Sequence, residues 1–328
     1  MTVLVTGGAG YIGSHMVYAL RDAGEEVVVL DNLSTGFRWA LPDSVQLYEG
    51  DTGDGSLARA IMARHGIDAV IHFAASIVVP ESVADPLGYY RNNTANTRTL
   101  IEAAVQSGVR HFIFSSTAAV YGNPEQVPVT EDARLSPMSP YGSSKLMSEI
   151  ILRDTEQAHG LKYAILRYFN VAGADPQMRT GQSTPAATHL IKVAVQAALG
   201  LRRKMDVYGT DYPTPDGTCI RDYIHVSDLV RAHSDALAHL RDGGASGTFN
   251  CGYGRGFSVF EVIDTVKQVS GSDFTVDLAA RRAGDPAQIV AASDLIRETF
   301  GWTPRYDDLP TIVGHALEWE RYLRTRNT

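Results

Sequence analysis

The stretch VLVTGGAGYIG, residues 3–13, decides the fold class. Four residues that favour a buried strand lead into closely spaced glycines, and an amphipathic helix is expected to follow. Gly7, Gly10 and Gly13 fit the pattern G-x-x-G-x-x-G, and Gly8 in place of Gly7 gives the related G-x-G-x-x-G. Glycines at these positions permit a tight turn and bring a bound pyrophosphate close to the backbone at the helix N-terminus. The stretch therefore predicts a strand, a turn and a helix that bind a dinucleotide.

An acidic residue at the end of the next expected strand favours one cofactor over another. Asp31 ends the run at residues 26–31, 18 positions after Gly13 (13 to 31). A carboxylate there accepts hydrogen bonds from the adenosine ribose hydroxyls and repels a 2′-phosphate. NAD is therefore the predicted cofactor. A glycine turn that binds nothing is disfavoured, because strand, glycines and acid agree.

Short apolar runs alternate with amphipathic segments through the first half of the chain. The runs are apolar on both faces, as in parallel strands that helices cover on both sides. We expect strands at 3–6, 26–31, 45–49, 69–73, 110–115 and 163–168, and helices at 11–23, 55–65, 86–106 and 140–159. This order predicts an α/β fold with a doubly wound parallel sheet of the Rossmann type. Ligands of such folds gather at the carboxyl ends of the strands.

The regular alternation ends near Asn170. Residues 175–188 and 208–219 are rich in Gly, Pro, Thr and Asp, with an expected helix at 189–199 between them. We expect an NAD-binding domain formed by residues 1–170 plus 225–253. Residues 171–224 plus 254–328 are expected to form a smaller C-terminal α/β lobe that binds the substrate.

A tyrosine and a lysine four positions apart begin the expected helix at 140–159. Tyr141 and Lys145 share one face of that helix. The ordinary pKa of a tyrosine, about 10, is too high for a base at neutral pH. A nearby ammonium group, together with a positive nicotinamide ring, lowers this pKa. The pair is therefore a candidate general acid and base.

Three hydroxyl residues in a row end the expected strand at 110–115. Of Ser115, Ser116 and Thr117, we select Thr117 to hydrogen-bond the reacting hydroxyl and relay its proton. For Ser115 or Ser116 we expect a structural role in capping the loop that follows.

Composition excludes several classes of function. The chain has 328 residues and a formal net charge of −8, so nucleic acid and anionic membrane surfaces would repel it. Its two cysteines, Cys219 and Cys251, do not make a disulfide framework, and the N-terminal residues lack a basic signal segment. A cytoplasmic protein is therefore expected. The histidines and cysteines lack the spacing of zinc motifs, so no metal site is predicted.

Three further phrases carry a resemblance to a known family. LRYFN stands at 166–170, YPTPDGTCIRDYIHV at 212–226 and RRAGD at 281–285. With the glycine-rich start and the Thr117, Tyr141 and Lys145 set, the chain resembles the extended short-chain dehydrogenase/reductase family. The second and third phrases are similar to those of the UDP-glucose 4-epimerases within it. The resemblance runs from Val3 to the region of Trp302 and implies a homodimeric isomerase of UDP-hexoses.

The resemblance also implies a role for individual residues. The residues implied to bind NAD are Gly7, Gly10, Tyr11, Ile12 and Gly13 at the pyrophosphate, Asp31 and Asn32 at the ribose, Asp51 and Thr52 at the adenine, and Phe73, Ala74, Ala75, Asn92, Lys145 and Tyr168 along the remainder. The residues implied to bind the UDP-hexose are Thr117 and Tyr141 at the sugar, and Asn170, His189, Leu190, Tyr208, Arg221, Arg282 and Asp285 at the UDP part. Arginine suits this task because its planar fork binds phosphate oxygens bidentately.

Three positions differ from the pattern of that family. Ile77 stands where many epimerases carry a lysine, so one contact to a cofactor phosphate is expected to be missing. His189 replaces an asparagine. Ile289 stands where side-chain bulk varies to admit or exclude N-acetylated sugars, and its intermediate size leaves that choice open.

The implied reaction is transient oxidation at C4 to a 4-keto sugar, followed by return of the hydride to the opposite face. The alternative is a 4-epimerase of another UDP-sugar: a UDP-N-acetylhexosamine, a UDP-pentose or UDP-glucuronate. A 4,6-dehydratase is disfavoured, because Ala118 and Ala119 follow Thr117 where such enzymes carry an acidic pair. A catalytically inactive NAD-binding sensor is disfavoured by the retention of Thr117, Tyr141 and Lys145 together.

Overall fold

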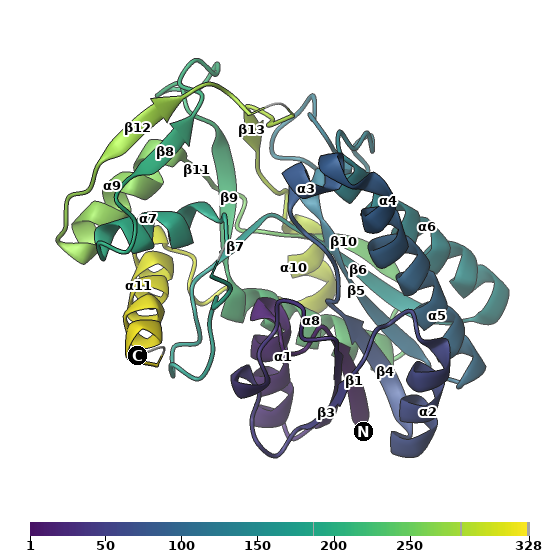
Figure 1. Ribbon diagram of the computed structural model, residues 1–328. Helices are drawn as coiled ribbons and strands as arrows, with labels where there is room; N and C mark the ends of the chain where they lie inside the picture. The colour runs from purple at the N-terminus through teal and green to yellow at the C-terminus, as the bar shows by residue number, and fades with distance from the viewer. Residues whose placement is uncertain (186, 283, 327–328) are drawn as a thin grey trace.

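The computed structural model describes residues 1–185, 187–282 and 284–326, so Ala283 of the RRAGD phrase lies outside the described residues. A seven-stranded sheet with helices on both faces forms the larger part of the molecule (Figure 1). Its strands are β1 (Thr2–Thr6), β2 (Glu26–Asp31), β3 (Gln46–Glu49), β4 (Ile67–His72), β5 (His111–Thr117), β6 (Lys162–Tyr168) and β10 (Gly247–Cys251). Their order is β10-β6-β5-β4-β1-β2-β3, and every pairing is parallel. The predicted α/β fold with a doubly wound parallel sheet is confirmed.

Helices cover the two faces of this sheet and form two cores. They are α1 (Tyr11–Asp22), α2 (Gly55–His65), α3 (Val79–Ala84), α4 (Pro86–Tyr89), α5 (Asn96–Gln106), α6 (Pro140–His159), α8 (Val226–Arg241) and the short 3-10 helices η1 (Arg38–Ala40) and η3 (Ala118–Val120). On one face α1 packs against α8, and Met16 and Leu229 belong to the core beneath them. On the other face α2 packs against α5 over Leu100 and Phe112. Because both faces of a strand such as β2 are buried, its sequence is continuously apolar rather than alternating.

The order of the strands reverses between β1 and β4. From β1 the chain adds β2 and β3 on one side, whereas β4, β5 and β6 extend the sheet on the other. The loops after β1 and β4 therefore diverge and leave a crevice at the carboxyl edge, where open α/β sheets bind their ligands. The glycine turn follows β1, and Thr117 and Tyr168 end β5 and β6 at the same edge.

The helix predicted at residues 86–106 is helical throughout, but its middle is not α-helical. A π-helical segment, η2 (Tyr90–Ala95), interrupts it between α4 and α5. The amide of Asn93 is engaged by another segment: its Oδ1 accepts from the Ser76 N–H at 2.8 Å, and its Nδ2 donates to the Ser76 carbonyl at 2.9 Å. A single π turn of this kind re-aims side chains within a helix and is common at functional sites. A pattern of apolar residues alone does not reveal it.

The remaining elements form a smaller lobe beside the sheet. Its strands are β7 (Asn170–Ala172), β8 (Met205–Tyr208), β9 (Ile220–His225), β11 (Gly256–Ser258), β12 (Val276–Ala279) and β13 (Gln288–Ile289), and its helices are α7 (Leu190–Ala198), α9 (Val259–Ser270) and α11 (Leu309–Arg326). Helix α10 (Asp294–Phe300) instead packs against the sheet domain, where Ile296 joins the core beneath α8. Strand β9 pairs with β7, β11 and β13, whereas β8 pairs with β12. Helices α7, α9 and α11 share one core, and α10 packs on β10.

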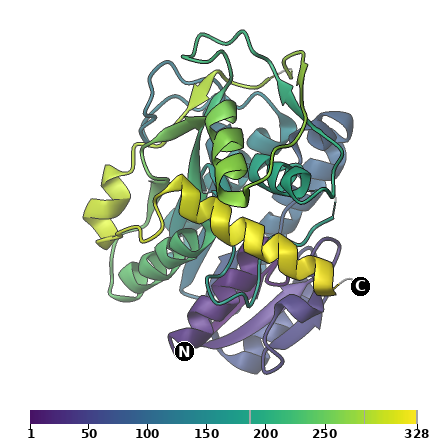
Figure 2. The same ribbon diagram turned by 90° about the vertical axis from the view of Figure 1, so that its left-hand side faces the viewer.

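Helix α11 connects this lobe to the N-terminal segment. Figure 2 shows the yellow helix crossing the front of the molecule toward the purple elements. Trp319 of α11 stacks on Trp39 with 6.4 Å between the ring centroids, and the Arg326 guanidinium lies 4.2 Å from the centroid of the Trp39 ring. The two parts of the chain are therefore in direct contact. Within the described residues, the structure has no helix that is long and apolar enough to cross a membrane.

Candidate active site

The glycine turn between β1 and α1 is too crowded for side chains. Gly7 has a φ of +68°, and a Cβ there would lie 2.6 Å from the Ala74 nitrogen. A Cβ on Gly13 would lie 2.1 Å from the Gly7 carbonyl oxygen. Gly10 caps α1 and has no side chain to occupy the first-turn N–H groups. The turn is thus a backbone cradle at a helix N-terminus, which fits the pyrophosphate of NAD.

Asp31 ends β2 beside this cradle. Its Oδ2 accepts from the Ala9 N–H at 2.9 Å and its Oδ1 from the Leu33 N–H at 2.8 Å. Burial raises the pKa of Asp31, and these two backbone hydrogen bonds oppose the rise. The carboxylate therefore holds the glycine turn in place, and each oxygen keeps a further lone pair for a ribose hydroxyl.

Asn32, expected at the ribose, meets the residues expected at the adenine at the ends of β2 and β3. Asn32 Nδ2 donates to Asp51 Oδ2 at 3.3 Å, and Thr52 beside it is buried. Asp51 Oδ1 accepts from the Asn96 side chain at 2.8 Å, which ties this corner to α5. The structure thus brings Asn32, Asp51 and Thr52 together.

The segment after β4 forms the other wall of the crevice. The Phe73 ring packs 4.8 Å, centroid to centroid, from that of His233, and Ala74 contacts the glycine turn. Asn92 Nδ2 donates to Ser76 Oγ at 3.0 Å. Ile77, the residue that replaces the family lysine, follows directly and is 50% exposed, so it brings no charge to this wall.

Tyr141 and Lys145 lie on the first turns of α6, under the carboxyl end of β5. Pro140 begins the helix and the Ser139 hydroxyl caps it by accepting from the Gly142 N–H at 3.2 Å. Lys145 is buried, and its Nζ donates to the Ser115 carbonyl at 2.9 Å. The helix and β5 are thus joined at the position of the predicted catalytic pair.

Thr117 meets Tyr141 from the end of β5. A hydrogen bond from the Thr117 hydroxyl lowers the pKa of Tyr141, although burial raises that pKa overall. Thr117 pairs in register with Tyr168 of β6, and the Tyr168 hydroxyl forms a hydrogen bond with Ser115 Oγ. Thr117, Tyr141, Lys145 and Tyr168 are therefore neighbours. The lowering of the Tyr141 pKa by lysine and nicotinamide stays a prediction for the NAD complex.

The hydroxyl side chains of Ser115, Ser116 and Thr117 on β5 have different partners from those that the sequence predicted. The prediction that Ser115 or Ser116 caps the following loop is wrong, because Thr117 Oγ1 accepts from the Ala119 N–H at 3.1 Å and caps η3. Ser116 Oγ instead donates to Glu149 at 2.6 Å. All three side chains alternate along an extended strand, so Ser116 points to the face opposite its two neighbours.

Burial sets the protonation of the lysine. It lowers the pKa of Lys145 to about 7, and the charge of Glu149 opposes this change. The pKa of His72 on β4 is lowered to about 3, first by burial of the imidazole and then by the charge of Lys145. A group whose pKa lies so near the working pH is typical of an acid–base site.

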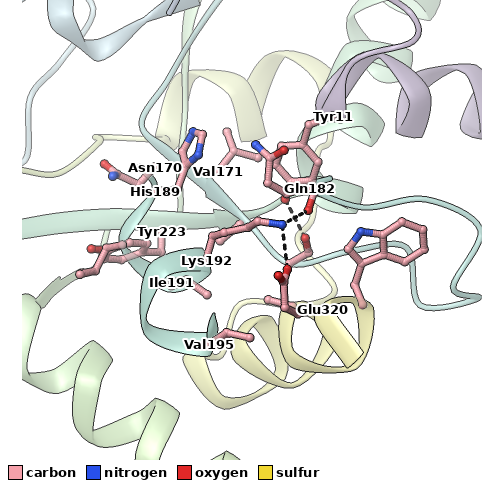
Figure 3. A pocket seen from close by; sticks show the side chains of 15 residues that line it. Tyr11, Asn170, Val171, Gln182, His189, Ile191, Lys192, Val195, Tyr223 and Glu320 are labelled. Carbon is pink, nitrogen blue, oxygen red and sulfur yellow. Dashed lines mark hydrogen bonds and ion pairs between the residues drawn. The ribbon is translucent and has the colours of Figure 1, made fainter. Parts of the chain in front are cut away.

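A cavity in the smaller lobe, bordered by Tyr11 of α1, brings together part of the residues expected at the UDP (Figure 3). Asn170, His189 and Leu190 line it, together with Tyr11 from the start of α1. Tyr11 Oη donates to the Gly173 carbonyl at 2.7 Å, and this hydrogen bond holds the start of α1 against the lobe. The cavity therefore adjoins the cofactor cradle.

The other residues expected at the UDP lie outside the lining of this cavity. The Arg282 guanidinium stacks 3.8 Å from the centroid of the Tyr208 ring. Arg221 Nη2 lies 3.7 Å from Asp285 Oδ1. Strand β9 links the two groups, because Arg221 and the cavity residue Tyr223 are two positions apart on it.

Comparisons with known proteins agree with this geometry. The model of the NAD dependent epimerase/dehydratase family matches residues 3–252. A UDP-glucose 4-epimerase of Azospirillum brasilense is 61% identical over 98% of this chain and 92% of its own length. The chain belongs to the UDP-glucose 4-epimerase family.

Further relatives extend the comparison to solved structures. A UDP-glucose 4-epimerase of Halalkalibacterium halodurans is 49% identical over 98% of this chain and 96% of the relative. The crystal structure of a UDP-glucose 4-epimerase from Brucella ovis in complex with NAD has a TM-score of 0.94 and 45% identity, covering 97% of each chain. The family predicted from the sequence is confirmed.

Two departures from the family pattern can now be placed. Ile289 pairs in register with Arg221 and is buried beside Ala118 and Tyr121. It therefore lies between strand β9 and the segment that follows Thr117. His189 stands at the N-cap position of α7 without a side-chain capping hydrogen bond, and its buried Nδ1 has no hydrogen-bond partner among the described residues. Both side chains are thus positioned toward the region where the epimerase family is expected to hold its substrate.

Sequence reasoning missed several residues of this region. Tyr223 lines the cavity, and its place in the RDYIHV phrase could have indicated it. Gln182, Lys192 and Glu320 line it as well, but no local pattern marks them. Their proximity depends on helix packing between segments more than a hundred residues apart.

Proposed function

We propose that this protein is an NAD-dependent UDP-glucose 4-epimerase that interconverts UDP-galactose and UDP-glucose. The observation that carries the proposal is the convergence of Thr117, Tyr141 and Lys145 beside a glycine cradle that fits NAD. The 61% identity to a UDP-glucose 4-epimerase over nearly the whole chain supports the same substrate class.

The chain's own groups supply the acid–base chemistry. Tyr141, as phenolate, takes the proton of the sugar 4-hydroxyl, and Thr117 orients that hydroxyl by a hydrogen bond. Lys145, held by the Ser115 carbonyl, places a positive charge near the phenolate when it is protonated. NAD, when bound, takes up the C4 hydride and gives it back, so the reaction has no net redox change.

The proposed substrate site separates a fixed part from a mobile part. Arg221 and Arg282 hold the diphosphate, and Asn170, His189 and Leu190 line the adjoining cavity. With the nucleotide anchored, the 4-keto sugar can turn its other face toward the cofactor. Tyr141 then returns the proton to the 4-oxygen of the inverted sugar.

We further propose a cytoplasmic homodimer. Apolar side chains are exposed on adjoining helices: Val83 of α3 is 64% exposed, Leu87 of α4 79% and Ile150 of α6 47%. Helices from this part of the chain are expected to pair with those of a second copy. Sedimentation equilibrium should give about twice the chain mass of 35.6 kDa, and Ile150→Glu should give the monomer mass. A monomeric wild type would refute the dimer.

The test of function is a direct assay. Purified protein is incubated with UDP-galactose, with and without added NAD, and UDP-glucose is followed by chromatography. Product in either case supports the proposal, and product only with added NAD indicates weak cofactor retention, as expected from Ile77. Absence of product with UDP-galactose, but turnover of UDP-N-acetylgalactosamine, UDP-xylose or UDP-glucuronate, would assign the alternative substrate.

A further inference from the structure

A buried carboxylate lies on α6, beneath the proposed catalytic residues. Glu149 is 0% exposed, and four hydrogen bonds reach it. Its Oε1 accepts from Ser116 Oγ at 2.6 Å and from Arg167 Nε at 3.0 Å. Its Oε2 accepts from Arg167 Nη2 at 2.6 Å and from Arg153 Nη2 at 2.8 Å. A charge this deeply buried is tolerated only with such complete pairing.

Two of the three partners of Glu149, Ser116 and Arg167, each adjoin a proposed active-site residue in the chain. Ser116 precedes Thr117 on β5, and Arg167 precedes Tyr168 on β6. Ser116 and Arg167 pair in register, as do the two residues that follow them. Glu149 itself lies one turn after Lys145 on α6, on the same helix face. One carboxylate therefore joins the three elements that carry the proposed chemistry.

Arg167 is also held by a hydrogen bond on the side of its guanidinium away from Glu149. Arg167 Nη1 donates to the Tyr121 hydroxyl at 2.9 Å, and that hydroxyl donates to Asn250 Oδ1 at 2.7 Å. Asn250 Nδ2 donates to the Val129 carbonyl at 2.8 Å. All of these side chains are buried. The network extends to β10 and to the loop after η3, so Glu149 cannot shift without breaking bonds to the sheet.

Glu149 also acts on Lys145 through its charge. Burial lowers the pKa of Lys145 to about 7, and Glu149 is the group that raises it. The titratable and charged groups around the two side chains are Tyr141 and Arg153 on α6, His72 on β4, Tyr121 after β5, Glu131 in the following loop, and Tyr163 and Arg167 on β6. Arg153 and Arg167 form ion pairs with the carboxylate directly.

We propose that Glu149 is a positioning residue for the reaction. Through Ser116 and Arg167 it holds the ends of β5 and β6 against α6, and its charge helps to keep Lys145 protonated beside Tyr141. Because Glu149 is fully buried, we expect it to contact neither sugar nor cofactor. The effects on kcat and KM that we expect from this role rest on the proposed epimerase function.

The first test compares Glu149→Gln with Glu149→Asp and with a matched control, Glu156→Gln. Glu156 lies two turns further along α6 and pairs with the partly exposed Lys162, away from the proposed catalytic residues. We expect Glu149→Gln to lower kcat for UDP-galactose about tenfold or more, with KM within about twofold of the wild type. We expect Glu149→Asp, which keeps the charge, to recover most of kcat, and Glu156→Gln to match the wild type.

The pH profile separates positioning from mere structural support. Without the Glu149 charge, the pKa of Lys145 falls below about 7, so the alkaline limb of the kcat profile moves to lower pH. Loss of the lysine charge raises the pKa of Tyr141, so the acid limb moves to higher pH. A narrowed profile in Glu149→Gln, but not in Glu149→Asp, supports the proposal. If Glu149→Gln had a lower kcat but a pH profile of unchanged shape, the loss would reflect only a smaller fraction of active enzyme. That result would overturn the electrostatic role.

A second readout is independent of epimerase activity. The chain has five lysines, so 13Cε-lysine NMR can follow each titration, with Lys145 assigned by its loss in Lys145→Met. The Lys145 pKa should be lower in Glu149→Gln than in the wild type, whether or not UDP-galactose is a substrate. An unchanged Lys145 pKa would refute the inference, whereas an inactive wild type would refute only the proposed function.

If Glu149→Gln fails to fold, Ser116→Ala carries the test. It removes the bond between β5 and the carboxylate and leaves the pair with Arg167 in place. We expect kcat to fall about threefold or more with unchanged limbs of the pH profile. Full kcat in Ser116→Ala would overturn the proposal.

Discussion

A buried ion pair forms part of the wall of the cavity and allows a quantitative prediction (Figure 3). Lys192 Nζ donates to Glu320 Oε2 at 2.7 Å and to the Gln182 carbonyl at 2.6 Å. The two charged side chains are each 7% exposed. Lys192→Met keeps most of the apolar stem but removes the cation. We predict that it lowers the free energy of unfolding at pH 7 by about 3–4 kcal/mol.

Two estimates agree on this magnitude. Removal of one partner from a buried pair costs about 3–5 kcal/mol. The orphaned carboxylate keeps one donor, Gln196 Nε2 at 2.9 Å, which favours the lower part of that range. Alternatively the carboxyl takes up a proton, which from a reference pKa of about 4.3 costs about 1.36 × 2.7, or about 3.7 kcal/mol, at pH 7. Protonation therefore sets an upper limit to the loss.

The same argument fixes the pH dependence of the loss. At pH 5 the proton costs only about 1.36 × 0.7, or about 1 kcal/mol. The folded variant binds this proton and the unfolded chain does not, so the variant gains stability relative to the wild type as pH falls from 7 to 5.

Urea denaturation, followed by tryptophan fluorescence at pH 7 and pH 5, measures both values. Trp319 lies one residue from Glu320, so its emission reports on this region. The control is the double variant Lys192→Met with Glu320→Leu, which removes both charges and should recover most of the stability. An equal loss at both pH values, or a double variant as unstable as the single one, would refute the reasoning.

Three further predictions concern the proposed chemistry. Tyr141→Phe should lower kcat about 10²- to 10⁴-fold while calorimetry shows unchanged UDP-galactose binding, and a smaller loss would remove Tyr141 as the base. Asp31→Ala removes the acceptor of two backbone N–H groups and of the ribose, so NAD affinity by calorimetry should fall about tenfold or more. Ile289→Ala enlarges the space beside Arg221, so the ratio of kcat/KM for UDP-N-acetylgalactosamine to that for UDP-galactose should rise about tenfold. An unchanged ratio would show that this position does not select the sugar.

Elements with strong local signals could be predicted from the sequence to the residue. Helix α2 begins after Asp54, whose side chain accepts from two first-turn N–H groups, and ends at Gly66 in the left-handed region. Helix α6 likewise runs from the cap Ser139 to the left-handed Gly160. Because a cap and a glycine stop act through their immediate neighbours, the surrounding fold does not alter them.

Features that depend on distant partners could not be predicted. The π turn at Tyr90–Ala95 is associated with hydrogen bonds that Asn93 and Ser76 exchange, which apolar spacing does not encode. The division of hydroxyl roles among Ser115, Ser116 and Thr117 depends on which face of β5 meets α6. Sequence motifs predicted the proposed catalytic residues. The buried groups that hold them, such as Glu149 and Arg167, could be identified only from the structure.

The arrangement of strands offers a physical reason for the proposed inversion at C4. Tyr168 ends β6 in the sheet, and Asn170 begins β7 in the lobe only two residues later. Asn170 pairs in register with Tyr223 on β9, the strand that also carries Arg221. Arg221 of the proposed nucleotide anchor therefore belongs to a different sheet from β5 and β6, beside which Tyr141 lies on α6, although a single residue separates β6 from β7. A UDP-sugar held on β9 can keep its nucleotide fixed while the sugar ring, which β9 does not hold, presents either face to Tyr141.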